Sequence, residues 1–269
     1  MAMRLSFRDL GGTGEPIVIL HGLFGSSQNW TGMGRRLLPF GHVFALDLRN
    51  HGDSPHAPSH TLADCVADLA EWAGARSLQH GRHLRLIGHS MGGLVAMGFA
   101  IKHPEATAGV ASIDIAPRPY PPEHGEELRA MKADISACRS RADLDTRLMP
   151  IIPETRMRQF LLTNAVRSGD GFRWKPNIEA LEGSTVASDW AGVAGKFDGE
   201  ALLVAGARSE YVREEDHAVM RRYFPHARIE TLPEADHWPH VTAPDALEAV
   251  LGQFLERCNK AAAGPSGSM

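Results

Sequence analysis

Cysteine is scarce in this sequence, and its few thiols form no metal-binding or disulfide pattern. Cys65, Cys138 and Cys258 lie far apart, and no Cys-x-x-Cys pair occurs. An odd number of isolated cysteines argues against a disulfide framework and against a structural zinc site. We expect neither a metal ion nor a cofactor.

Long apolar runs and runs of positive charge are also missing. No stretch of 18 apolar residues occurs, and residues 1–10 lack the apolar core of a secretory signal. The formal net charge is -4, which argues against nucleic acid and anionic membranes as partners. A hydrophobic content of 43% with 22% charged residues is typical of a globular protein. We therefore expect a soluble, cytoplasmic protein with a small-molecule substrate. The sequence carries no signal for oligomeric state.

What the chain does have is a regular alternation of short apolar segments with segments of helical character. The expected strands are 4–10, 17–20, 42–48, 84–87, 109–115, 201–205 and 228–232. The expected helices between them are 29–38, 62–75, 94–103, 214–223 and 243–257. This alternation predicts an α/β fold with a mostly parallel central sheet and helices on both faces. A chain of 269 residues is long enough to bury one full core of this kind.

The alternation stops at the proline-rich segment 116–122 and resumes only after about Phe197. Helices are expected at 126–138, 154–167 and 178–191, with a Gly/Asp turn at 169–171. We interpret residues 118–197 as a helical cap inserted over the carboxyl ends of the strands. Residues 1–117 and 198–260 then form the α/β core. The small, polar residues 261–269 are expected to be a disordered or foreign tail.

The most informative stretch is Gly88-His89-Ser90-Met91-Gly92, which follows the apolar run Leu84–Ile87 and precedes a helical segment. This is the strand–turn–helix context of a nucleophile elbow, in which a serine occupies a strained, exposed turn. The neighbouring glycines lack the Cβ atoms that would collide as strand and helix approach each other. The alternative is a phosphate-binding turn of a nucleotide-binding sheet. The glycine spacings of such turns are absent at this position, so we identify Ser90 as the candidate nucleophile.

A serine hydroxyl needs a base to take its proton, and that base must be oriented by a third group. His237 follows the last expected strand, which is where the chain order of this fold places the base. Its rivals are His89, inside the elbow, and His240, on the far side of Pro239. Position along the chain, rather than residue type, favours His237.

Several residues compete for the role of the orienting acid. In most hydrolases of this kind the acid lies in the loop after the strand 201–205, where Ser209 occupies its usual position and Glu210 is one residue away. Asp114 lies near the end of the preceding apolar strand, where a carboxylate needs partners to offset its desolvation. Asp236, beside the base, is expected to be solvated. We favour Asp114 over Glu210 on geometric grounds, with capping of the following turn as its alternative role.

An acyl-transfer site also needs backbone N–H donors for the oxyanion. One donor is expected from Met91, the residue after the nucleophile, and the other from Leu23, which follows His21-Gly22. We expect Arg49, Asn50 and Asp53 to hold their own loop together by hydrogen bonds.

Six segments together resemble the YbfF-type esterases of the α/β-hydrolase superfamily. They are His21–Ser26, Asp47–Pro55, Gly88–Gly93, Asp114–Pro117, Arg208–Val212 and His237-Trp238. The resemblance implies the α/β-hydrolase fold with Asp114 as the triad acid and Ser209 as support for the histidine. It also implies activity on short-chain acyl esters, or on acyl thioesters such as acyl-CoA. Leu94 and Asp236 depart from the family pattern, which has Lys and Gly there.

The leading hypothesis is a serine carboxylic-ester hydrolase for short to medium acyl esters. It acts through Ser90, His237 and Asp114 and an acyl-enzyme intermediate. We expect the cap to set acyl-chain preference, with residues 156–162 involved, without supplying catalytic groups. Thioester cleavage or C–C bond hydrolysis on the same groups is the alternative, because the fold does not determine the substrate. A non-catalytic ligand-binding homologue is a further alternative, but such proteins usually lack a triad residue.

Overall fold

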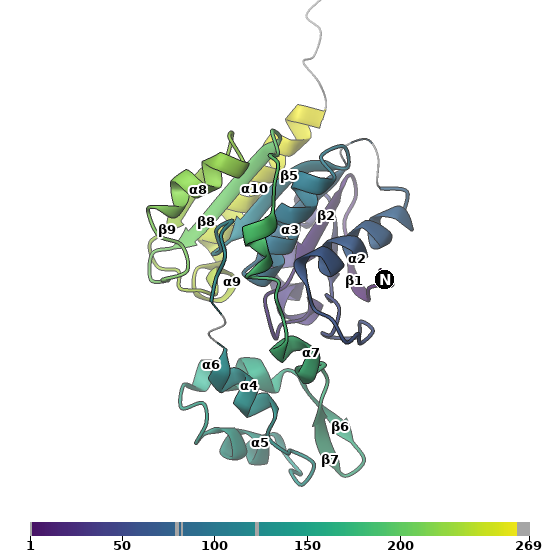
Figure 1. Ribbon diagram of the computed structural model, residues 1–269, viewed down its shortest axis with the longest axis vertical. Helices are drawn as coiled ribbons and strands as arrows, with labels where there is room; N and C mark the ends of the chain where they lie inside the picture. Colours follow the sequence, from purple (N-terminus) through teal and green to yellow (C-terminus); the bar gives the residue numbers. More distant parts are fainter. Residues whose placement is uncertain (1, 79–80, 82, 122–123, 263–269) are drawn as a thin grey trace, which may run out of the picture.

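The computed structural model describes residues 2–78, 81, 83–121 and 124–262, and its centre is a seven-stranded sheet (Figure 1). The strands of the sheet are β1 (Phe7–Gly11), β2 (Pro16–Leu20), β3 (His42–Leu46), β4 (Leu84–His89), β5 (Thr107–Ile113), β8 (Glu200–Gly206) and β9 (Arg228–Leu232). Their spatial order is β1-β3-β2-β4-β5-β8-β9. β1 pairs antiparallel with β3, and the other pairings are parallel. The α/β fold with a mostly parallel sheet is thus confirmed.

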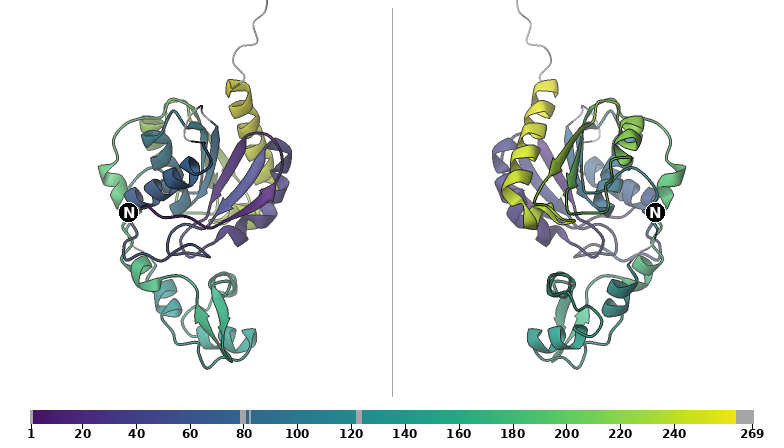
Figure 2. Two further views of the ribbon diagram at one scale, coloured as in Figure 1. Left: turned by 90° about the vertical axis from the view of Figure 1, so that its right-hand side faces the viewer. Right: turned by 90° about the vertical axis from the view of Figure 1, so that its left-hand side faces the viewer.

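Helices cover both faces of this sheet, as Figure 2 shows from two sides. The core helices are α1 (Thr31–Arg36), α2 (Leu62–Gly74), α3 (Met91–Lys102), α8 (Asp216–Tyr223), α9 (Pro239–Thr242) and α10 (Pro244–Ala262). One buried apolar cluster joins the sheet to α2, α3 and α8, and a second joins it to α1 and α10. Strands β2, β4 and β5 are buried along their whole length, because both of their faces are covered.

The elements from α4 to α7, between β5 and β8, form a separate layer that lies below the core in Figure 1. This cap contains α4 (Gly125–Met131), α5 (Arg141–Leu148), α6 (Thr155–Leu162), the hairpin β6 (Ala165–Ser168) and β7 (Gly171–Trp174), and α7 (Ile178–Glu182). It has its own apolar cluster, which also takes in Phe24 from the core. Asn177 ties the end of the cap to the core by donating from Nδ2 to Asn50 Oδ1 at 3.2 Å and to the Ala57 carbonyl at 3.1 Å.

Most core elements begin or end within a few residues of their predicted bounds, but several predictions in the cap were wrong. Residues 165–167 form a strand instead of continuing a helix, since the Gly/Asp turn that follows closes a hairpin. The helix predicted at 126–138 ends at Met131, and α5 was not predicted. The expected helix 178–191 is only the short α7, with a 3₁₀ turn at Asp189–Gly192. The expected tail from 261 is wrong in its first two positions, because α10 continues to Ala262, and residues 263–269 lie outside the described residues.

Candidate active site

Ser90 lies in a strained turn between β4 and α3. Its φ of 50° and ψ of -124° are unusual for a residue with a side chain, and it is the N-cap of α3. A Cβ at Gly88 would lie 2.2 Å from the Gly92 carbonyl oxygen, and one at Gly92 would lie 2.5 Å from the His21 carbonyl oxygen. Glycine at position 88 therefore allows β4 and α3 to close around this turn, and glycine at position 92 allows the helix to pack against the end of β2. The helix begins at Met91, three residues earlier than predicted, because the elbow itself is its first turn.

His237 and Asp114 come together from segments 123 residues apart in the chain. His237 Nδ1 lies 2.7 Å from Asp114 Oδ2. The same Oδ2 accepts the Ser209 hydroxyl, and Oδ1 accepts the Gly206 N–H at 2.9 Å. Asp114 is 0% exposed, so these three donors replace the water that the carboxylate loses on burial. Because a carboxylate only accepts, the bond to His237 fixes its Nδ1–H tautomer and leaves Nε2 free to accept a proton.

The other acids that the sequence offered lie elsewhere. Glu210 is exposed, whereas its neighbour Ser209 points to Asp114. Asp236 is not simply solvated, as was expected, because Arg156 of the cap forms an ion pair with it. Asp114 also lies just after β5 rather than inside a strand, with a φ of 52°. The predicted strand 109–115 therefore extended too far. The chain turns at Asp114, whose side chain reaches Gly206 at the end of β8.

Two residues that the sequence did not single out as partners of His237 hold it from other sides. The Tyr211 ring stacks on the imidazole at a centroid distance of 3.9 Å and 17° between planes. His89 Nε2 donates to the His237 carbonyl oxygen at 2.6 Å. Burial of His89 lowers its pKa well below the usual histidine value, so it remains a neutral donor. His240, the other rival for the base, stacks on Trp30, and burial lowers its pKa to about 4.

The loop Gly22–Gly25, which we call the oxyanion loop, approaches Ser90 from the end of β2. A Cβ at Gly22 would lie 3.2 Å from Ser90 Cβ. Leu23 therefore borders the nucleophile, and its N–H has no partner recorded among the described residues. Met91 is the first residue of α3. The first N–H groups of a helix have no acceptor within the helix, so the Met91 N–H makes no hydrogen bond inside α3. Leu23 and Met91 line one cavity together with Ser90, and their role as oxyanion donors stays a prediction.

Two cavities border Ser90. The first, about 150 Å³, contains His237 and is bordered by aromatic and sulfur side chains, with Met157 and Phe160 supplied by α6 of the cap. The second, about 230 Å³, does not contain His237 and is lined mainly by apolar side chains. Its lining includes Met91, Leu94 and Ile115 from the core and Leu128, Leu181 and Ala187 from the cap. We call them the His237 arm and the Leu94 arm.

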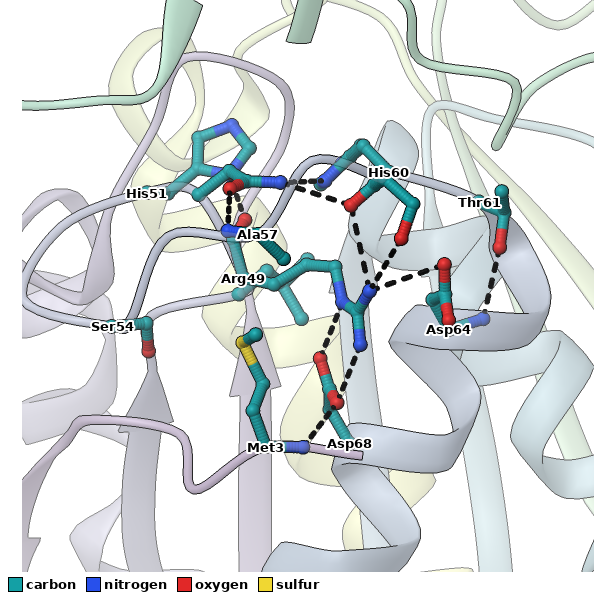
Figure 3. Close-up of polar contacts among 12 residues, drawn as sticks. Met3, Arg49, His51, Ser54, Ala57, His60, Thr61, Asp64 and Asp68 are labelled. Atoms are coloured by element: carbon teal, nitrogen blue, oxygen red, sulfur yellow. Dashed lines mark hydrogen bonds and ion pairs between the residues drawn. The ribbon is translucent and has the colours of Figure 1, made fainter. Parts of the chain in front are cut away.

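Side-chain contacts fix the loop that follows β3 to α2 and to the cap. Arg49 is 1% exposed and donates from Nε and Nη2 to the two carboxylate oxygens of Asp68 at 2.7 and 2.8 Å (Figure 3). Its Nη1 lies 3.1 Å from Asp64, also on α2. Asp53 N–H donates to Asp47 and its carboxylate pairs with Lys175 of the cap. Arg49 and Asn50 also hold the loop itself, as expected, through contacts with Ser59 and Ala57. The expectation was wrong for the Asp53 side chain, which ties the loop to the cap instead.

No metal-binding group of histidine, cysteine and acidic side chains occurs within the described part of the chain. Across the same residues, every helix is too short or too polar to cross a bilayer.

Comparisons with known proteins show the family of the chain. The profile of the Alpha/beta hydrolase family matches residues 17–250. The chain is 35% identical to the sn-1-specific diacylglycerol lipase ABHD11 of Mus musculus, over 93% of this chain and 85% of that one. It is 31% identical to Esterase YbfF of Escherichia coli K12, over 90% of this chain and 93% of that one. Among solved structures, a marine microorganism esterase superposes with a TM-score of 0.88 at 33% identity, covering 94% of this chain and 100% of the other.

A strained serine elbow, a histidine that shares its cavity and is paired with a buried carboxylate, and matches to esterases and a lipase over most of the chain lead to one classification. The chain belongs to the alpha/beta hydrolase family, as a hydrolase of the esterase and lipase type.

Proposed function

We propose that the protein hydrolyses carboxylic esters through an acyl-enzyme on Ser90. The observation that carries the proposal is the position of His237, held through Nδ1 by Asp114 and sharing a cavity with Ser90. In this arrangement His237 Nε2 accepts the Ser90 proton as the hydroxyl attacks the ester carbonyl. The Leu23 and Met91 N–H groups then stabilise the negative charge that develops on the carbonyl oxygen.

The histidine decides which arm holds which half of the substrate. The leaving oxygen must receive its proton from His237, so the alcohol half lies in the His237 arm. The acyl chain then extends into the larger Leu94 arm, whose apolar lining suits a short to medium hydrocarbon chain. The cap residues on the acyl side are therefore Leu128, Leu181 and Ala187. The segment 156–162, for which we expected a role in acyl-chain preference, borders the alcohol instead.

Charge in the His237 arm favours esters of neutral alcohols over acyl-CoA. Among the described residues that line this arm, Glu127 is acidic and none is a lysine or arginine. The phosphates of coenzyme A would need basic partners to offset their charge. Thioester cleavage of that kind therefore ranks second.

Partition between water and an added alcohol tests for the acyl-enzyme. Butyrate esters of p-nitrophenol, phenol and ethanol would be hydrolysed in the presence of a fixed methanol concentration. A common acyl-enzyme predicts the same ratio of butyric acid to methyl butyrate from all three, because the leaving group has departed before the choice is made. A ratio that changes with the leaving group would indicate direct attack of water on the ester and would contradict the proposal.

The arm assignment predicts that two cap substitutions act on opposite halves of the substrate. Ala187→Phe fills the Leu94 arm and is expected to lower kcat/KM for octanoyl relative to acetyl esters by about tenfold, a loss of about 1.4 kcal/mol. Phe160→Ala opens the His237 arm and is expected to change the preference among alcohols at fixed acyl chain. A matrix of acyl and alcohol variants measures both effects. The assignment fails if Ala187→Phe changes mainly the alcohol preference.

A further inference from the structure

In the oxyanion loop, Phe24 has an unfavourable backbone conformation that contacts with other parts of the protein must stabilise. Phe24 has a φ of 60° although it carries a bulky side chain, and it is 2% exposed. Such a residue persists only where its surroundings over-determine it. Both polar backbone groups of Phe24 are held. Its N–H donates to His51 Nε2 at 3.2 Å, and its carbonyl accepts from Asn164 Nδ2 at 2.7 Å.

The protonation state of His51 follows from its two partners. Nε2 accepts the Phe24 N–H, and Nδ1 lies 2.9 Å from the Arg49 carbonyl oxygen, which only accepts. His51 must therefore be neutral, with its proton on Nδ1. Complete burial, reinforced by the neighbouring His21 and His60, lowers its pKa well below the usual value. A proton on Nε2 would place two N–H donors against each other, and the hydrogen bond from the Phe24 N–H would be lost.

Arg49, whose carbonyl oxygen accepts from His51 Nδ1, is itself held in place by α2. Arg49 is the residue that α2 holds through Asp64 and Asp68, and Figure 3 shows His51 and His60 beside this network. A continuous set of contacts thus runs from α2 through Arg49 and His51 to the Phe24 N–H. Asn164, which is 3% exposed, reaches the same residue from the cap, just after α6. Phe24 is therefore fixed between core and cap.

The two other histidines beside His51 also contact the oxyanion side of the site. His21 Nε2 accepts the Leu48 N–H at 3.0 Å, and its Nδ1–H donates to the Gly22 carbonyl at 2.7 Å. His60 Nε2 lies 3.3 Å from Met91 Sδ. Burial lowers the pKa of His21, and lowers that of His60 to about 3. The histidines beneath the two oxyanion donors are thus uncharged at neutral pH.

We propose that His51 and Asn164 are positioning residues for the oxyanion. They hold the N–H and the carbonyl of Phe24 and so fix the adjoining Leu23 N–H against the carbonyl oxygen of the substrate on Ser90. The inference rests on the proposed function, in which Leu23 supplies an oxyanion donor.

Two substitutions at His51 separate this role from a general contribution to folding. Gln places a side-chain oxygen near the position of Nε2, where it can accept the Phe24 N–H. Asn places its amide near Nδ1, where it can donate to the Arg49 carbonyl, but it leaves Phe24 without an acceptor. Each variant keeps one of the two bonds, so similar losses of stability are expected, and urea unfolding measures both.

His51→Asn is expected to lower kcat for p-nitrophenyl butyrate by about 10- to 100-fold, with KM within about twofold. Loss of a complete oxyanion donor costs about 10²- to 10³-fold, and here the donor is displaced rather than removed. His51→Gln is expected to stay within about threefold of the unsubstituted enzyme. A trifluoromethyl ketone, whose adduct on serine carries the oxyanion, should lose affinity in His51→Asn by the factor lost in kcat/KM. Butyrate, which forms no such adduct, should inhibit both variants equally.

Equal losses of kcat in the two His51 variants, or an unchanged affinity for the ketone in His51→Asn, would overturn the inference. If His51→Asn does not fold, Asn164→Ala tests the inference instead. This substitution in the cap removes only the hydrogen bond from Asn164 Nδ2 to the Phe24 carbonyl oxygen. It is expected to lower kcat and ketone affinity together by about tenfold at constant KM, and wild-type values would overturn the inference. A methanol partition ratio that varies with the leaving group in the unsubstituted enzyme would instead disprove the proposed function.

Discussion

Ser90→Ala is expected to lose ester turnover by about six orders of magnitude while the protein keeps its fold. In a serine–histidine–carboxylate unit the residues act together, and removal of the nucleophile alone costs about 10⁶-fold in kcat. Ser90 makes its structural contacts through its backbone: its N–H donates to the Ile113 carbonyl at 3.0 Å, and its carbonyl accepts the Gly93 N–H. Alanine keeps both bonds, so the effect falls on chemistry. Initial rates on p-nitrophenyl butyrate measure it.

Ser168→Ala is the matched control, because Ser168 is an exposed serine in the cap hairpin. It is expected to retain the full rate. Residual activity of Ser90→Ala above about 0.1% of the wild-type rate, in protein free of wild-type contamination, would contradict the role of Ser90 as the nucleophile.

Asp114→Asn is expected to lower kcat by about four orders of magnitude. The Asn carbonyl oxygen is expected to keep the Gly206 N–H, since an amide NH₂ cannot accept that bond, and the NH₂ then faces His237 Nδ1. To accept from it, the imidazole must move its proton to Nε2, where it can no longer take the proton of Ser90. The same exchange in another serine–histidine–aspartate triad costs about 10⁴-fold.

Glu210→Gln is the control for this prediction, because Glu210 lies in the loop where the acid usually resides yet is exposed. It is expected to change kcat by less than about twofold, since an exposed side chain contributes little to the site. Circular dichroism and urea unfolding of both variants establish that they are folded. If Glu210→Gln loses activity and Asp114→Asn does not, the acid lies in the more usual loop.

The parts of this site that could be predicted from sequence are those for which the chain itself specifies the geometry. The elbow is recognisable because Gly88 is required by its near neighbours in the chain, since a Cβ there would collide with the backbone of Gly92 and Gly93. Asp114 could be favoured over Glu210 because a buried carboxylate needs partners. The structure supplies these partners as Gly206, Ser209 and His237.

Other parts of the site depend on contacts between distant segments and backbone groups, which leave no pattern in the sequence. His51 lies 27 residues from Phe24, and Asn164 lies 140 residues from it. Their partners are a main-chain N–H and a carbonyl, so no complementary side chain marks the pairing. The hairpin β6–β7 was missed for a related reason. Four-residue strands are too short for their alternation to be distinguished from the end of a helix.

Covalent capture of the nucleophile tests the central claim most directly. An alkyl fluorophosphonate would be added to the protein, and the modified residue would be located by peptide mass spectrometry. The account predicts one phosphonyl group per chain, attached to Ser90, and none on Ser90→Ala, because only a serine activated by His237 reacts at this rate. Attachment to a different serine, or equal labelling of Ser90→Ala, would contradict it.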